Sequence, residues 1–196
     1  MTFYQIAKGT ATLAKWAAER AVIDAACAVT GDEMTVELAR SAKLTGQPRA
    51  LKHLDNYLKA GGDIQVSIRE LLAEDDGVRE RFYSEVTKAL DANSEKGSNP
   101  HQWQTKGSVG IPQRYYTNAE WKNALGSINM NWILDGQDIV ASFVNVYRWH
   151  PEDNTRVSQC VHRAADNLKE KGAKDYNMVG TSTRIPVSEF TGVKPR

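Results

Sequence analysis

The stretch SINMNWILDGQDIVASFVNVYRW, Ser127–Trp149, decides the fold class that we predict for this chain. Apolar residues recur at every second position on both sides of Asp135-Gly136, and such a dipeptide is a strong signal for a two-residue hairpin turn. A turn centred there makes Leu134 face Gln137. In the same register, the apolar pairs on one side of the sheet are Trp132 with Ile139, Met130 with Ala141, and Ile128 with Phe143. Turn and pattern therefore agree on an antiparallel hairpin.

The second strand of this hairpin is apolar on its other side too. Val140, Val144 and Val146 alternate with the residues named above. A strand with apolar residues on both sides is typical of a sheet that is covered on both faces. We therefore expect cover on both faces of this strand.

Helix signals flank the hairpin. Thr117 and Glu120 have the spacing of a capping box, which predicts a short helix ended by Gly126. A longer helix is predicted at about Thr155–Lys171, with Gly172 just past its end. One or two short strands follow, over 174–181 and 184–187. Residues 108–196 are thus predicted to form an α+β domain with an antiparallel sheet.

The first 92 residues are rich in helix signals, and an N-terminal bundle of about five helices is predicted over 1–92. The expected helices are Ile6–Val29, Glu33–Ala42, Arg49–Ala60, a helix capped by Asp63 that carries Val66 to Leu72, and Val78–Leu90. Residues 93–107 are polar and rich in Ser, Gly and Asn, which is typical of a linker. Trp103 stands out in it, and either packs on a neighbouring surface or lies as a lid over a site.

Composition limits the function classes. Of 196 residues, 41% are hydrophobic and 25% charged, and the formal net charge is +1. This balance is typical of a globular chain and argues against a dedicated nucleic-acid-binding protein. Charges interrupt the Ala-rich N-terminal segment, so neither a transmembrane segment nor a signal peptide is expected. We expect a protein that is cytoplasmic in its producer and, if exported, leaves without a signal peptide.

Reactive side chains concentrate after the hairpin. Tyr147 and His150 lie at the expected end of the second strand, and Asp153 follows in the loop. Loops at strand ends commonly carry functional sites, and this mix suits acid–base chemistry in which a histidine or carboxylate activates water. Arg148 and Arg156 lie close enough in sequence to hold an anionic substrate. Ordinary loop charges at a strand end are the alternative.

The predicted helix after this loop holds Cys160 and His162. Cys160 falls within an apolar stripe with Val157 and Val161, which favours a core position over a reactive thiol. His162 lies on the polar side with Asp166, four residues on, so it is either a general acid–base group or a solvated surface histidine. The remaining substrate-binding candidates are Arg114 and Trp103. Arg114 lies beside Tyr115 and Tyr116, which could add an aromatic wall.

Several strong catalytic and nucleotide-binding motifs are absent from the sequence. It contains no GxGxxG, GxxxxGK[ST], HExxH or GxSxG. Its two cysteines, Cys27 and Cys160, lie far apart and lack the spacing of a structural zinc site. No cofactor and no metal ion are predicted.

The two-part layout resembles bacterial secreted toxins of the polymorphic and type VI effector kind, which pair a helical delivery segment with a compact α+β toxin domain. The stretch EWKNALGSINMNWILDGQDIVASFVNVYRWHPEDN, residues 120–154, is also similar to the core of colicin-M-like bacteriocins, which cleave lipid II. Tyr147 and His150 match that pattern, and Asn145 stands where an acidic residue is expected.

This resemblance implies an antibacterial effector that hydrolyses an envelope or phosphoester substrate. Its partner would be a cognate immunity protein or a component of the secretion machine. The lack of a strong catalytic motif supports the other hypothesis, a non-enzymatic binding protein such as an adaptor or immunity protein. Both function classes stay open at the level of sequence.

Overall fold

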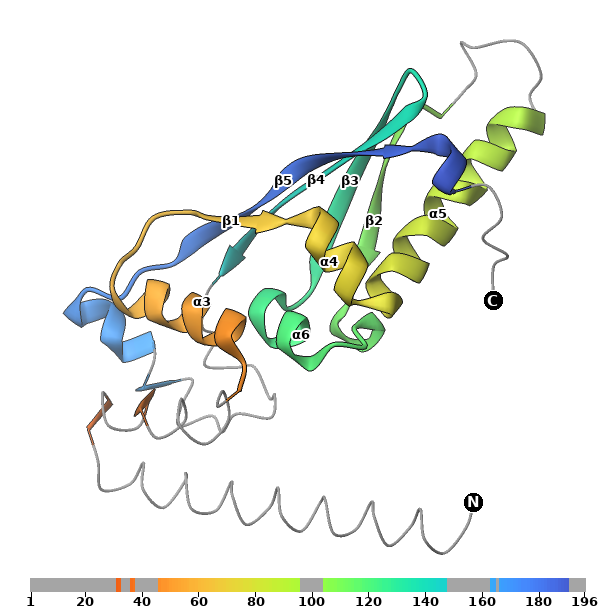
Figure 1. Cartoon of the computed structure of the whole chain (residues 1–196). Helices are drawn as coiled ribbons and strands as arrows, with labels where there is room; N and C mark the ends of the chain where they lie inside the picture. The colour runs from red at the N-terminus through yellow and green to blue at the C-terminus, as the bar shows by residue number, and fades with distance from the viewer. Residues whose placement is uncertain are drawn as a thin grey trace, which may run out of the picture. The chain divides into compact units, whose positions relative to one another are not determined.

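A computed structural model describes residues 31–32, 36–37, 46–95, 104–147, 163–164 and 166–190 of the chain. The chain divides into two compact units, Met1–Gly61 with Arg148–Asp175, and Gly62–Tyr147 with Tyr176–Arg196. The second unit contains a five-stranded sheet, and the two units are described separately below (Figure 1).

The sheet has the strand order β1-β5-β4-β3-β2. Its strands are β1 Ile64–Ser67, β2 Lys106–Ile111, β3 Ile128–Asp135, β4 Asp138–Tyr147 and β5 Tyr176–Pro186. β1 pairs with β5 in parallel, and the other three pairs are antiparallel. The α+β class is therefore confirmed, but the sheet is mixed and not purely antiparallel. β5 is a single strand whose pairing with β4 is irregular between Ala141 and Phe143.

The β3–β4 hairpin forms, but its turn lies one residue later than predicted. Asp135 pairs with Asp138, and Trp132 pairs with Ala141 in place of Ile139. Gly136 is the first central residue of the turn, with a φ of 62°, a conformation that glycine adopts without the steric strain of other residues. Since the pairing moves by two positions, each side chain keeps its predicted face. Arg184 of β5 binds both turn carboxylates, at 2.5 Å from Asp135 and 3.2 Å from Asp138.

The prediction of a separate N-terminal five-helix bundle is wrong, because β1 lies within residues 1–92 and joins the sheet. Ile64–Ser67 alternates between buried and exposed side chains, the period of a strand. Asp63 does not cap a helix; its carboxylate accepts a bond from the Asn177 backbone N–H, at 3.0 Å. Ser67 caps the short helix α4, Ile68–Glu74, through a bond from the Glu70 N–H, at 3.2 Å.

Two of the helices predicted in this region are confirmed. α3 spans Pro48–Leu58, and α5 spans Asp76–Glu95 and is longer than expected. The predicted linker begins within α5: the Asn93 amide bonds both the N–H and the carbonyl of Gln104, at 2.6 and 2.9 Å. The predicted helices over 6–29 and 33–42 fall wholly or largely outside the described residues.

Helices α4, α5 and α6 lie on one face of the sheet (Figure 1). α6 spans Ala119–Leu125 and ends at Gly126, as predicted, but its cap is Asn118 and not Thr117. The Asn118 side chain accepts bonds from the N–H groups of Glu120 and Trp121, at 2.9 and 3.5 Å. The main buried side chains of these helices are Ile68, Leu71, Val78, Phe82, Val86, Trp121 and Leu125.

In the first unit, α3 buries Leu54 and Tyr57. The predicted end of the helix before Gly172 is confirmed. Gly172 is the C-cap residue, and its φ of 109° is a conformation that glycine adopts readily at a helix end. The Lys174 N–H then donates to the Tyr57 carbonyl at 2.9 Å, which ties the chain after the helix to α3.

Candidate functional site

The face of the sheet that meets the helices is built for packing. Phe143 of β4 is 1% exposed, and a methyl group added at Gly180 of β5 would overlap its ring and approach Ile68 of α4. The buried strand side chains on this inner face include Val66, Val109, Ile111, Ile128, Met130, Trp132, Ile139, Ala141, Phe143, Met178 and Ile185. Such close contact leaves no room for a ligand between the sheet and these helices at this point.

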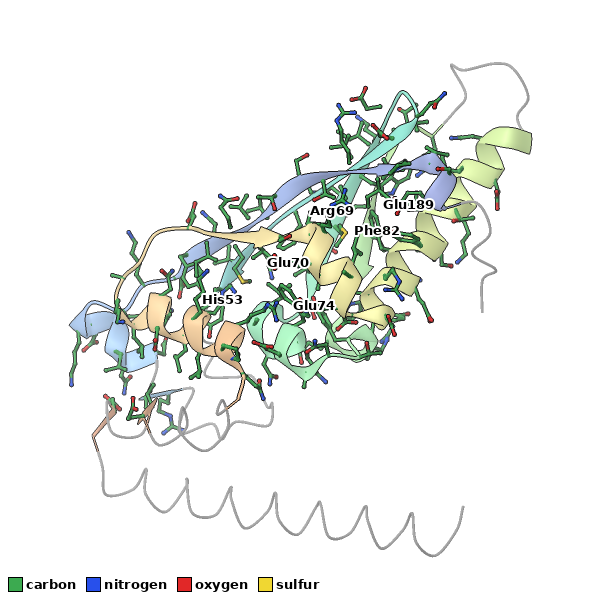
Figure 2. The ribbon with its side chains drawn as sticks, viewed as in Figure 1. His53, Arg69, Glu70, Glu74, Phe82 and Glu189 are labelled. Carbon is green, nitrogen blue, oxygen red and sulfur yellow. The ribbon has the colours of Figure 1, made fainter. Side chains whose placement is uncertain are left out.

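A buried carboxylate helps to hold the helix layer together. Asp75, just before α5, has no exposed surface. Its two oxygens accept bonds from the N–H groups of Val78, Thr117 and Asn118, at 3.0, 3.1 and 2.9 Å, and from the Thr117 hydroxyl at 3.1 Å. These bonds join the start of α5 to the start of α6, which explains why Thr117 does not serve as the α6 cap. A second polar contact joins Glu74 of α4 to the Trp121 indole N–H at 3.0 Å (Figure 2).

The opposite face of the sheet presents apolar side chains to solvent. We call Ile133, Val140, Val144, Val146 and Val179 the open apolar stripe. Three of them are largely exposed: Ile133 at 54%, Val144 at 64% and Val146 at 45%. Ile133 pairs with Val140 across β3 and β4, and Val144 pairs with Val179 across β4 and β5, so the stripe crosses three strands. The prediction that β4 is covered on both faces is therefore wrong.

The side chains around the open apolar stripe are uncharged over most of this face. By strand alternation, the uncharged neighbours that share the face are Gln65, Ser108, Asn129, Asn131, Ser142 and Thr181. Charged groups gather at the hairpin end, where Lys106 lies opposite Ile133. There Arg184 donates hydrogen bonds to Asp135 and Asp138, and these bonds raise the pKa of Arg184. Depletion of charge around exposed apolar residues is the compositional sign of a protein-binding surface.

Tyr147 is the one member of the predicted catalytic set that the described residues contain. It is the last residue of β4 and pairs with Tyr176 of β5, and the two rings stack with centroids 5.1 Å apart. Burial, and then Tyr147, raise the pKa of Tyr176. The stack gives Tyr147 a packing role at the end of the sheet.

Asn145, where the colicin-M-like pattern has an acid, also has a structural role. Its side-chain amide donates to the carbonyls of Leu125 and Ser127, at 3.2 and 3.0 Å, and so fixes the turn between α6 and β3. A carboxylate cannot donate these bonds, which gives a physical reason for an amide at this position.

Arg114 belongs to a different cluster. It lies in the 3₁₀ turn η2, Gln113–Tyr115, with its guanidinium carbon 5.2 Å from the centre of the Tyr115 ring. Arg81 of α5 lies 5.1 Å from the same ring. Tyr116 is buried, so Arg114 and the two tyrosines do not form one exposed surface.

The other predicted site residues lie outside the described residues. They are His150, Asp153 and His162 of the catalytic set, and Arg148, Arg156 and Trp103 of the substrate-binding set. Cys27 and Cys160 lie outside them too. The structure therefore does not test whether the residues of the predicted site after β4 lie close together.

The described histidine, His53 of α3, is a core residue (Figure 2). It is 4% exposed, and burial, then the charge of Lys52, lower its pKa to about 4. It is therefore neutral at neutral pH and not poised as an acid–base group there.

Two further searches of the described residues were negative. No group of three or more His, Cys, Asp or Glu is placed there to hold a metal ion, and no helix in those ranges is long and apolar enough to cross a membrane. Comparison with known proteins found no matching family model, no matching curated protein and no matching solved structure.

Sequence reasoning missed the open apolar stripe as a site, although its signal was present. The alternating valines of β4 are that signal, but the same pattern also predicts a second covering layer. The composition of the neighbouring strand distinguishes an exposed face from a covered one. Asn129 and Asn131 of β3 share this face, whereas a covered face would carry apolar residues at those positions.

Proposed function

We propose that this protein is a non-enzymatic binding protein, of the adaptor or immunity kind, that binds a partner protein through the open apolar stripe. The carrying observation is the exposure of Ile133, Val144 and Val146 on the sheet face opposite the helices. The charged neighbours on this face lie at its hairpin end, where Lys106 is opposite Ile133 and Arg184 is opposite Val140. Burying such side chains contributes about 25 cal/mol per Å² of apolar surface, which drives most protein association.

The chemistry of the face defines the partner's contact surface. A charged partner surface would lose its hydration against valines and isoleucine without gaining ion pairs. An apolar, uncharged surface, such as one side of an amphipathic helix, loses little favourable hydration and can pack over the sheet. The amides of Asn129 and Asn131 at the edge supply hydrogen bonds that set orientation.

The test uses the full chain together with the products of the genes that flank its own. Wild-type protein is co-expressed with each product, and complexes are identified by size-exclusion chromatography with light scattering. Val144→Asp places a charge in the centre of the stripe and is expected to weaken the complex by at least about tenfold. Ala119→Asp is the matched control, because it adds the same charge at an exposed position on α6.

Three results would count against the proposal. A complex that is insensitive to Val144→Asp would show that the partner binds elsewhere. A homodimer that Val144→Asp separates would show that the stripe binds a second copy of this chain. A protein with no partner and a measurable hydrolase activity would favour an enzyme.

An antibacterial effector that hydrolyses an envelope or phosphoester substrate remains the second proposal. Its support is the position of Tyr147 at the end of β4, because His150 and Asp153 then follow directly after a strand of the sheet. The test is toxicity in a bacterium when wild type or His150→Ala is directed to the cytoplasm or to the periplasm. Wild-type protein that is harmless in both compartments would contradict it.

A further inference from the structure

A small pocket lies on the helix side of the second unit, away from the open apolar stripe. Its volume is about 210 Å³, and α4, α5, β5 and the 3₁₀ turn η4, Val187–Glu189, form its walls. Leu72, Ala73 and Ile185 contribute apolar surface. Pockets for drug-sized ligands have volumes of about 300–1,000 Å³, so this one suits a smaller group.

One side of the pocket carries a tyrosine and a carboxylate. The Tyr83 hydroxyl donates to Glu189 at 3.2 Å. Burial, and then Glu189, raise the pKa of Tyr83 to about 12, while the charges of Arg79 and Arg69 act in the opposite direction. Arg69 and Arg79 line the same pocket as Tyr83.

The two arginines of the pocket are not equivalent. Arg79 is already paired, with Asp76 at 2.6 Å and with the Leu72 carbonyl at 3.2 Å. Arg69 donates only to the Arg184 backbone carbonyl, at 3.3 Å, and among the described residues it has no carboxylate partner. It extends from α4 on the same side as Glu189 (Figure 2). A guanidinium presents five donors, so most of those of Arg69 remain available to a ligand.

We propose that this pocket binds an aliphatic monocarboxylate, with the carboxylate on Arg69 and the hydrocarbon part against Leu72 and Ile185. Arginine and carboxylate match in geometry and charge. A phosphate dianion is disfavoured, because Glu189 lines the same pocket and repels a second negative charge. The small volume excludes a nucleotide and admits a single residue.

Two sources carry this chemistry. The last residue of a peptide chain offers a carboxylate and an aliphatic side chain but no free amine. A free aliphatic amino acid adds an ammonium group, which Glu189 is placed to accept. The amine distinguishes the two sources.

The test is calorimetric titration of the full chain with N-acetyl-leucine, leucine and leucine amide. We expect the two carboxylates to bind and leucine amide not to bind. Tighter binding of N-acetyl-leucine would assign a chain end, and tighter binding of leucine a free amino acid. Failure of both carboxylates to bind, or equal binding of the amide, would overturn the proposal.

Variants separate the role of Arg69 from general effects. Arg69→Gln is expected to weaken carboxylate binding at least about tenfold, and Ala73→Leu, which fills the pocket without changing its charge, by a similar factor. Arg184→Gln is the control: it removes an arginine from the opposite face but keeps the carbonyl that Arg69 contacts. Unchanged binding in Arg69→Gln would contradict the assignment. Since Val144→Asp does not touch the pocket, loss of partner binding and loss of carboxylate binding are separate outcomes.

Discussion

The two faces of the sheet differ most clearly at neighbouring residues of β4. Phe143 is 1% exposed and faces the helix layer, whereas Val144, the next residue, is 64% exposed on the other face. Both are apolar, so hydrophobicity alone does not distinguish their roles. The inner face removes apolar surface from water during folding, whereas the open face leaves apolar surface in water, which under our proposal a partner protein would cover.

This difference implies that stability and binding can be changed separately. Substitutions on the inner face should lower the free energy of unfolding, and substitutions on the open face should leave it nearly unchanged. The four predictions below test that separation, in decreasing order of expected effect.

Phe143→Ala is expected to lower the free energy of unfolding by about 3–5 kcal/mol, because it leaves a cavity between β4 and α4. Urea denaturation followed by circular dichroism measures the change. Val144→Ala serves as the control from the adjacent position. Similar losses in both variants would show that the open face is buried in the native protein.

Asp75→Ala is expected to cost about 3 kcal/mol, because it leaves the buried N–H groups of Val78, Thr117 and Asn118 without acceptors. Asp75→Asn keeps one acceptor oxygen and should lose less. The same denaturation experiment measures both. A loss below about 1 kcal/mol in the alanine variant would mean that the helix layer does not depend on this carboxylate.

Gly180→Ala is expected to lower the free energy of unfolding by about 1–3 kcal/mol through overpacking, because the added Cβ would overlap the Phe143 ring. Gly62→Ala, where a Cβ meets nothing within 4 Å, is the matched control. Thermal unfolding compares the two variants. Equal midpoints would argue against the close contact between β5 and the Phe143 ring.

Val144→Ser is expected to change the free energy of unfolding by less than about 0.5 kcal/mol, the usual range for exposed positions. Val144→Ser should instead weaken the complex with the partner, which is measured as a larger dissociation constant. A clear loss of stability without a loss of binding would reverse the roles that we assign to the two faces.

Local patterns in the sequence predicted the elements better than their assembly. The apolar pattern of the hairpin predicted the correct face for its alternating apolar residues, because a two-position slip preserves the side of each side chain. β1 was missed since a four-residue strand next to α4 carries too few periods to be distinguished from a helix start.

The contacts that define the candidate sites are long-range, which is why local patterns did not indicate them. Asp75 and Thr117 are 42 residues apart, and Arg69 and Arg184 are 115 apart. Nothing in the sequence near Asp75 marks it as buried, since Asp75-Asp76-Gly77 is typical of an exposed turn. Its burial follows only from the approach of α6.

The position of β5 between β1 and β4 has a consequence for how the protein is made. Asp63, beside β1, and Asn177, in β5, are bonded across 114 residues. At a translation rate of about 5–20 residues per second, β1 waits roughly 6–23 s on the ribosome before its partner strand is synthesised. The β2–β3–β4 meander can pair during that interval, but β1 and the outer edge of β4 stay unpaired, which makes this a period when chaperones would be expected to engage the nascent chain.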